Sequence, residues 1–178
     1  METKLIATVV SVILAPFSIA GADSQTISND REHYRVSLPQ NWTVWGIGPS
    51  GVLSATSYPK TRALEGGLVP SGEAAINIFP HKGTTTTINE WIAEAVKYVE
   101  EVHRTKVTLD TRHGDVSSYI EVEARYDSGP DVFYRRVTAF YVLKDRIFAA
   151  QLEFKEGDSS EAKYRGILNE VIRSIVSI

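Results

Sequence analysis

Apolar and polar positions alternate in the segment YRVSLPQNWTV, residues 34–44. Every second residue from Tyr34 to Leu38 is apolar, and a second alternating run begins at Trp42, after Pro39 and two polar residues. A period of two is typical of strands with one buried face, and proline tends to end them. The pattern predicts two strands joined by a turn. We expect Trp42 to plug the core at this reversal; the alternative is that its ring is a binding platform.

Five further segments have strand patterns bounded by turn residues, at 52–58, 74–79, 116–126, 132–143 and 146–154. The segment 132–143 is largely apolar on both alternating faces, whereas 116–126 alternates between apolar and charged positions. Short polar connections join the last three segments, which favours an antiparallel meander. We therefore expect 132–143 to be a central strand packed on both sides.

Two segments have helical periodicity. Thr87 and Glu90 form a T-x-x-E capping box ahead of apolar residues at helical spacing. Asp158 and Glu161 open the last helix, whose apolar face comprises Tyr164, Leu168, Val171, Ile172 and Ile175. One helix precedes the meander and the other follows it, so each can cover one face of the sheet. The pattern predicts an α+β fold, an α/β/α sandwich around an antiparallel sheet of about six to seven strands.

The first residues differ from the rest of the chain. Residues 5–19 are almost all apolar and are followed by Ala20, Gly21 and Ala22, which is the pattern of a signal peptide. We expect cleavage after Ala22, with an uncleaved anchor as the alternative. The next segment, 23–32, is polar without periodicity and is predicted to be a flexible lead-in. The folded domain is then expected at 33–178.

Composition narrows the class of protein. The chain has 19 Lys and Arg against 22 Asp and Glu, a net charge of −3, and no cysteine. Nucleic-acid binding calls for a clustered basic excess, so we expect no nucleic-acid partner. An exported chain without disulfides must be stabilised by its core, and this composition suits a bacterial periplasm.

The element order of four strands, helix, three strands and helix resembles the PsbP-like (DcrB-like) family. The resemblance also rests on YRVSLPQNW near the expected mature start and on the terminal KYRGILNEVIRSIVSI. It implies an α/β/α sandwich and an exported, non-catalytic binding or assembly module that acts on an envelope or membrane-associated complex. The sequence has no long N-terminal binding arm and no cysteine for a lipid anchor. A photosystem role is therefore not expected, and the module is expected to be peripheral to the membrane at most.

The candidate binding residues are Arg125, Tyr134, Arg135 and Arg136. Arginines beside aromatic rings in a strand can hold a carboxylate or stack on a partner. The alternative interpretation is cross-strand ion pairing with acidic residues of the same sheet, namely Glu121, Glu123 or Glu153.

Motifs for catalysis are weak. GIGPSG, residues 46–51, matches a dinucleotide-binding motif, but a strand pattern follows where a helix would be needed, so a hairpin loop is expected. SYPK, residues 57–60, matches a serine acylase motif, but Pro59 opposes the required helical turn. No nucleophile–base pair is visible, so we expect no enzyme and no cofactor.

A small-ligand or metal-binding periplasmic protein is the alternative function. It would use the loops 46–51 and 60–72 with Arg135 or Arg136. His113 and Asp115 in RHGD could supply two metal ligands if His81 or Asp127 lay close, but a solvated loop histidine is favoured and no metal ligand is assigned.

Overall fold

The computed structural model describes residues 23–60, 69–81, 87–102, 107–113, 118–127, 133–143 and 146–178. For Val102, residues 107–113, residues 118–127 and Leu143 only the backbone is described. The chain forms β1 (Ser24–Asn29), β2 (Tyr34–Pro39), β3 (Thr43–Ile47), β4 (Leu53–Thr56), β5 (Ala74–Pro80), α2 (Ile88–Val102), β6 (Val107–His113), β7 (Ser118–Asp127), β8 (Phe133–Leu143), β9 (Arg146–Lys155), α3 (Glu161–Ser174) and β10 (Val176–Ser177).

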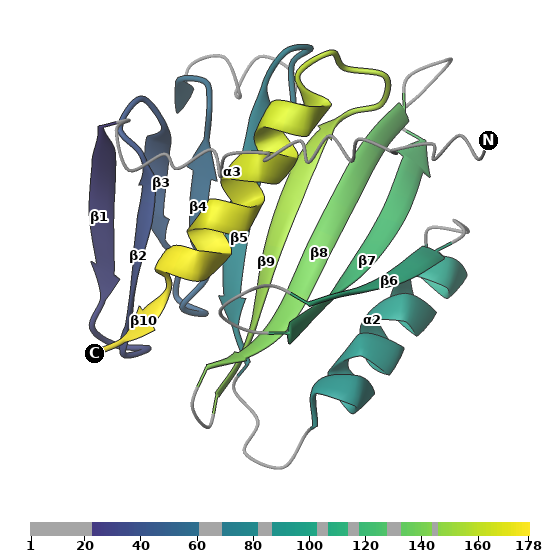
Figure 1. Ribbon diagram of the computed structural model, residues 1–178, viewed down its shortest axis with the longest axis horizontal. Coiled ribbons are helices and arrows are strands. Elements are labelled where there is room, and N and C mark those ends of the chain that lie inside the picture. The colour runs from purple at the N-terminus through teal and green to yellow at the C-terminus, as the bar shows by residue number, and fades with distance from the viewer. Residues whose placement is uncertain are drawn as a thin grey trace, which may run out of the picture.

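The strands form two antiparallel sheets (Figure 1). The main sheet has seven strands in the order β3-β4-β5-β9-β8-β7-β6, and the small sheet has three in the order β1-β2-β10. The predicted α+β class and the antiparallel meander of β7, β8 and β9 are confirmed. No helix in the described part of the chain is long and apolar enough to cross a membrane.

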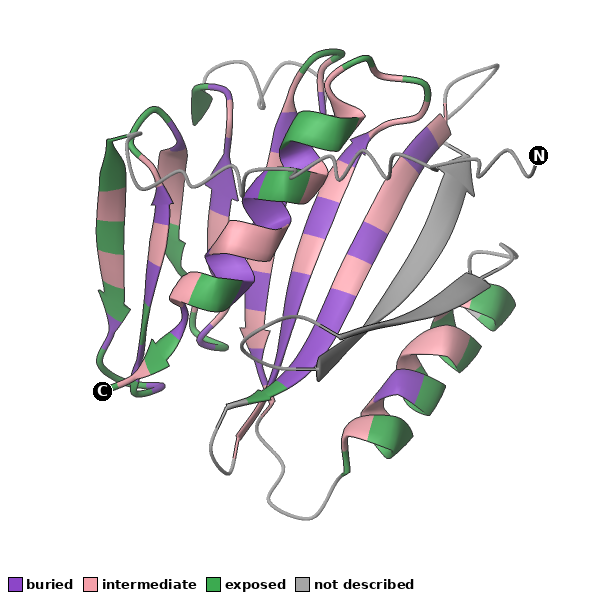
Figure 2. Cartoon of the chain, in the orientation of Figure 1, coloured by how far each residue is buried: buried purple, intermediate pink, exposed green. Residues whose placement is uncertain are grey.

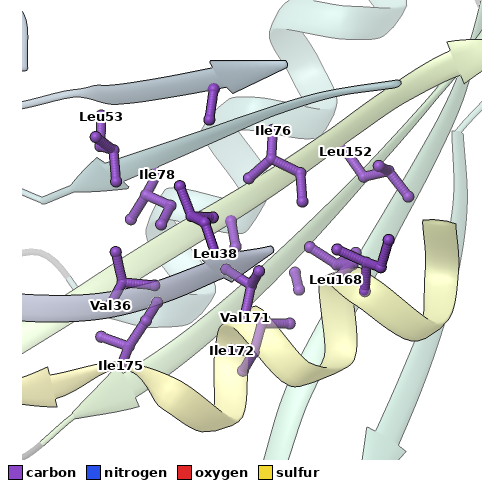
Figure 3. Close-up of a cluster of buried hydrophobic side chains, with 14 of the residues drawn as sticks. Val36, Leu38, Leu53, Ile76, Ile78, Leu152, Leu168, Val171, Ile172 and Ile175 are labelled. Atoms are coloured by element: carbon purple, nitrogen blue, oxygen red, sulfur yellow. The ribbon is translucent and has the colours of Figure 1, made fainter. Parts of the chain in front are cut away.

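The main core lies between the sheet and α3. Alternate residues of β4, β5, β8 and β9 point to this face and pack against α3 and against β2 of the small sheet. Figure 2 shows the buried bands on the strands beneath α3, and Figure 3 shows the aliphatic side chains that meet there. The predicted apolar face of the last helix is confirmed, because Tyr164, Leu168, Val171 and Ile172 are all buried.

The helix α2 contacts the face of the main sheet opposite to the face that packs against α3. Its capping box is present: the Thr87 N–H donates to Glu90 Oε2 at 2.6 Å, and the Glu90 N–H donates to Thr87 Oγ1 at 3.3 Å. Ile92 of α2 packs with Phe140 and Ala149, which alternate with the residues that face α3. β8 is therefore a central strand that is covered on both faces. Some of its residues pack toward α3, and Phe140 packs toward α2.

Trp42 plugs the core, as predicted. It is 5% exposed. Its N–H closes the turn by donating to the Pro39 carbonyl at 3.0 Å, and its ring meets the Tyr164 ring edge to face at 6.2 Å between centroids. The binding-platform alternative is wrong because almost none of the ring is available to a ligand.

The prediction of a flexible lead-in at 23–32 is wrong for its first half. Residues 24–29 form β1, which pairs with β2 from Ser24↔Pro39 to Asn29↔Tyr34. Gln25 fixes the strand by donating from Nε2 to the carbonyls of Pro39 and Trp42, at 3.1 and 2.6 Å. This polar edge strand is held by backbone pairing and by the Gln25 amide. It does not need a buried apolar face, so its sequence lacks the alternating pattern that would have predicted a strand.

The sequence pattern also placed the segment 34–39 in one sheet with the others, whereas it belongs to the small sheet. One edge of β2 pairs with β1. Its other edge pairs with β10 only at Tyr34 and Arg35. Further along this edge, the Ser174 side chain occupies the backbone groups of Ser37. Its Oγ accepts from the Ser37 N–H at 2.9 Å and lies 3.3 Å from the Ser37 carbonyl oxygen. The backbone of β2 is thus closed to a further strand at Ser37.

Candidate functional site

The predicted arginine pair does not form one site. Arg135 and Arg136 are neighbours in β8, so their side chains point to opposite faces of the sheet. Arg136 donates from Nε to Glu153 Oε2 at 2.8 Å, which is the cross-strand pairing named as the alternative. Arg135 pairs instead with Glu156, at 3.2 Å from its Nη2 to Oε1. The two guanidinium groups therefore cannot hold one carboxylate together.

The other two predicted residues are placed differently. Tyr134 is buried at 6% exposure, and its hydroxyl donates to the Val69 carbonyl at 3.0 Å. Burial raises the pKa of this phenol, and the charge of Glu153 adds to the shift. Arg125 lies opposite Arg135 in the backbone register of β7 and β8, but its side chain is outside the described residues.

A groove runs along α3, between this helix and the end of β2 with the turn that follows it. Its larger part is a hollow of about 970 Å³, and a smaller hollow of about 140 Å³ continues from it. The two share Pro39, Ile167 and Glu170. From residue 162 to residue 174 of α3 the groove extends about 18 Å, at 1.5 Å per residue. The other walls come from the β2–β3 turn, from Ser24 and Ser37, and from Ser57, Gly72 and Glu73.

Hydrogen bonds fix the wall of the groove opposite the small sheet. Ser57 Oγ donates to Glu73 Oε2 at 2.6 Å and accepts from the Ala74 N–H at 2.8 Å. The Tyr164 hydroxyl donates to the Gly72 carbonyl at 2.6 Å. Burial raises the pKa of Tyr164, so the phenol stays protonated and keeps this bond at neutral pH.

Asp158 ties the same wall to the start of α3. Its carboxylate accepts from the Ser160 N–H at 2.8 Å and from the Gly72 N–H. These backbone donors, that of Ser160 first, lower the pKa of Asp158. The groove is therefore preformed, because its two sides are held by bonds that do not involve an occupant.

Gly166 is the point where the groove reaches the helix backbone. A Cβ built on this residue would have no neighbour within 4 Å. A glycine inside a helix costs about 1 kcal/mol relative to alanine, and here no packing contact requires it. The glycine leaves open space over the middle of α3.

The remaining sequence motifs have structural roles. The expected hairpin is confirmed, because β3 pairs antiparallel with β4 and the Gly48 N–H donates to the Val52 carbonyl at 2.9 Å in the turn between them. Gly46 and Ile47 still belong to β3. Lys60 Nζ donates to the Trp45 carbonyl at 3.1 Å, whereas Ser57 is bound to Glu73. Within the described ranges no group of three or more His, Asp or Glu side chains could hold a metal ion, while the side chains of His113 and Asp127, and all of Asp115, lie outside them.

Sequence reasoning missed the groove. Its lining comes from five separate parts of the chain, which only the tertiary structure brings together. One signal was available, since Gly166 interrupts an otherwise regular amphipathic pattern in the last helix.

Comparison with solved structures identifies the fold. Cyanobacterial PsbP from Synechocystis sp. PCC 6803 aligns with 93% of this chain and 99% of its own, at 15% identity and a TM-score of 0.56. The Ran-binding protein Mog1p of Saccharomyces cerevisiae aligns with 88% of this chain and 96% of its own, at 11% identity and a TM-score of 0.56. No family model matches the chain, and a search of curated proteins finds no match. The chain therefore has a PsbP-like fold, in agreement with the resemblance found in its sequence.

Proposed function

We propose that this chain is an exported, non-catalytic binding module that docks on an envelope or membrane-associated complex through the groove along α3. The observation that carries the proposal is the preformed hollow of about 970 Å³ beside α3. Its length of about 18 Å would hold roughly five residues of an extended segment, at about 3.3 Å per residue. The proposal includes the α/β/α sandwich layout of the PsbP-like family and cleavage of the predicted signal peptide after Ala22.

The side chains of the groove support binding rather than catalysis. The Ser57 hydroxyl is bound between Glu73 and the Ala74 N–H, where it fixes the wall. No histidine lines either hollow among the residues that the structure describes. Among the described residues, the groove thus supplies apolar lining at Pro39 and Ala162 and polar groups at its rim, but no activated nucleophile.

The fold is compatible with this role. The yeast protein that shares it is a Ran-binding protein, and cyanobacterial PsbP shares it as well. At these identities the likeness concerns the fold alone, so the partner must be found by experiment.

Blocking the groove at Gly166 tests the proposal. The variant Gly166→Trp places a large ring in open space, so we expect it to fold and to lose the partner that the wild type captures from its native envelope fraction. The matched control is Gly166→Ala, which adds one methyl group and should retain capture. Circular dichroism verifies that both variants are folded. Equal capture by all three proteins would exclude the groove.

The predicted arginines remain a second possible docking surface, and the same experiment examines them. Arg135→Ala and Arg136→Ala each remove one cation whose acidic partner is on β9 or just after it. Loss of capture in one of these variants, with Gly166→Trp still active, would place docking on that face of β8 instead. The small-ligand alternative predicts a rise in Tm with a metal ion or small anion and no protein partner.

A further inference from the structure

On the face of the main sheet that contacts α2, a band of polar residues, which we call the polar channel, lies between two hydrophobic clusters. On one side Ile92 of α2 packs with Phe140 and Ala149. On the other side Tyr58, Val69 and Tyr134 form a separate cluster. Between the clusters lie two rows of residues that cross the sheet perpendicular to its strands. α3 covers the opposite face, so the channel is independent of the groove described above.

The first row consists of uncharged polar side chains from four adjacent strands. The backbone register places Ser54 opposite Asn77, Asn77 opposite Gln151, and Gln151 opposite Thr138. All four residues are half-buried. Alternating positions of the same strands are occupied by the apolar core, so the polar row is confined to this face.

The row has hydrogen-bonding capacity that the described residues do not use. Ser54 Oγ donates to Asn77 Oδ1 at 2.6 Å, and Gln151 Nε2 donates to Thr138 Oγ1 at 3.2 Å. The Asn77 Nδ2 donors and the Gln151 Oε1 acceptor have no partner in the described part of the chain. Half-buried amides gain free energy from a partner that supplies both a donor and an acceptor.

The second row is electrically neutral. It contains Arg136 and Glu153, which face each other and form an ion pair through Arg136 Nε at 2.8 Å. An added anion would have to compete with the Glu153 carboxylate for the guanidinium group. The floor of the channel therefore favours a neutral, polar ligand over a charged one.

The wall beside α2 is aromatic. A crevice of about 190 Å³ lies between this helix and the polar rows, and Phe79, Trp91 and Tyr98 form much of its lining. Arg136, Thr138 and Gln151 line its floor. Tyr98 is 58% exposed. The volume is below the range of about 300–1,000 Å³ for pockets that hold drug-sized molecules, so one small ring fits.

We propose that this crevice binds one ring of a neutral carbohydrate. A pyranose has C–H groups on its faces and hydroxyl groups around its rim. The C–H face can pack on the aromatic wall, while each hydroxyl both donates and accepts and so matches the amide of Gln151 in the crevice and that of Asn77, its neighbour in the polar row. From Gln151 the polar row continues across the strands to Asn77 and Ser54, where further rings of an oligosaccharide would meet polar side chains.

The test is an NMR titration of the folded chain with maltotriose, cellotriose and chitotriose. One of these probes is expected to shift the side-chain amide signals of Asn77 and Gln151 and the indole N–H of Trp91, with a Kd on the order of 1 mM for contacts of this number. The variant Gln151→Ala should weaken that binding at least about fivefold, which corresponds to the loss of roughly one hydrogen bond. The control Gln40→Ala alters an exposed turn away from the channel and should bind normally.

Three outcomes would overturn the proposal. These are the absence of shifts with all three sugars, shifts that Gln151→Ala leaves unchanged, and shifts that occur with benzoate but with no sugar. The last result would assign the crevice to an organic anion and so to Arg136. Since α3 lies on the other face, the groove variant Gly166→Trp should bind the sugar like the wild type.

Discussion

The two faces of the main sheet differ in how they are covered. The face toward α3 and the small sheet has a continuous core with members from β2, β4, β5, β8, β9 and α3. Among the side chains that the structure describes, the cluster between α2 and the other face has three buried members, namely Ile92 of the helix and Phe140 and Ala149 of the sheet. Hydrophobic stabilisation scales with buried apolar area, so among the described side chains the first face contributes most of it. The second face instead carries rows of polar residues, which do not contribute to a hydrophobic core.

The largest difference in stability is expected between alanine variants of Trp42 and Trp45. Trp42 is buried on the α3 face, whereas Trp45 is only half-buried and donates from Nε1 to Thr56 Oγ1 at 2.8 Å. We expect Trp42→Ala to lower the free energy of unfolding by about 3–5 kcal/mol. Trp45→Ala should cost about 1 kcal/mol, close to the value of one hydrogen bond. Urea denaturation of both variants measures the contrast.

Equal losses for Trp42 and Trp45 would contradict the assignment of stability to the α3 face. An unchanged m-value in both variants would verify that the denatured states are comparable.

The two helices provide the next comparison. Leu168 of α3 is 1% exposed within the large core, and Ile92 of α2 is 6% exposed within the small cluster. Truncation of such side chains to alanine costs about 2–5 kcal/mol, depending on how well the site is packed. We expect Leu168→Ala near about 4 and Ile92→Ala near about 2 kcal/mol on this range. Thermal unfolding monitored by circular dichroism measures both, and the reverse order would refute the comparison.

Strong periodicity explains what could be predicted from the sequence. The strand 132–143 and the helix that begins after Thr87 were found because their apolar residues repeat at two and at 3.6 positions. Trp42 could be placed because Pro39 fixes a turn just before it. These signals come from the burial of side chains, so they report elements that face a core.

Features held by backbone pairing or by tertiary contact could not be predicted. β1 is polar and is stabilised by its register with β2, and β10 is two residues long. The partner of Arg135 is Glu156, which lies just beyond the end of β9 and so is not obvious from an expected strand register. The groove and the polar channel are assembled from distant segments, and therefore no local motif marks them.

Gly166→Ala should have a smaller effect with the opposite sign. The residue lies within α3, is exposed, and has open space where a Cβ would be. Alanine is favoured over glycine inside a helix by about 1 kcal/mol, so the variant should be more stable by about that amount. Urea denaturation measures the change. A loss of stability would mean that the methyl group meets an obstacle, and the groove would then be narrower than described.

The smallest expected effect concerns pH and the wall of the groove. The pKa of Asp158 is lowered from its ordinary value of 3.8 by the N–H groups of Ser160 and Gly72. A carboxylate with a lowered pKa contributes stability above its ordinary pKa, and this contribution is lost as the pH falls through the pKa of the folded state. The variant Asp158→Asn keeps the size of the side chain but does not titrate. We expect the wild type to exceed this variant in stability near about pH 6, and the difference to shrink below about pH 4. Urea denaturation at both pH values measures it, and a difference that stays constant would show that the Asp158 carboxylate does not tie this wall to α3.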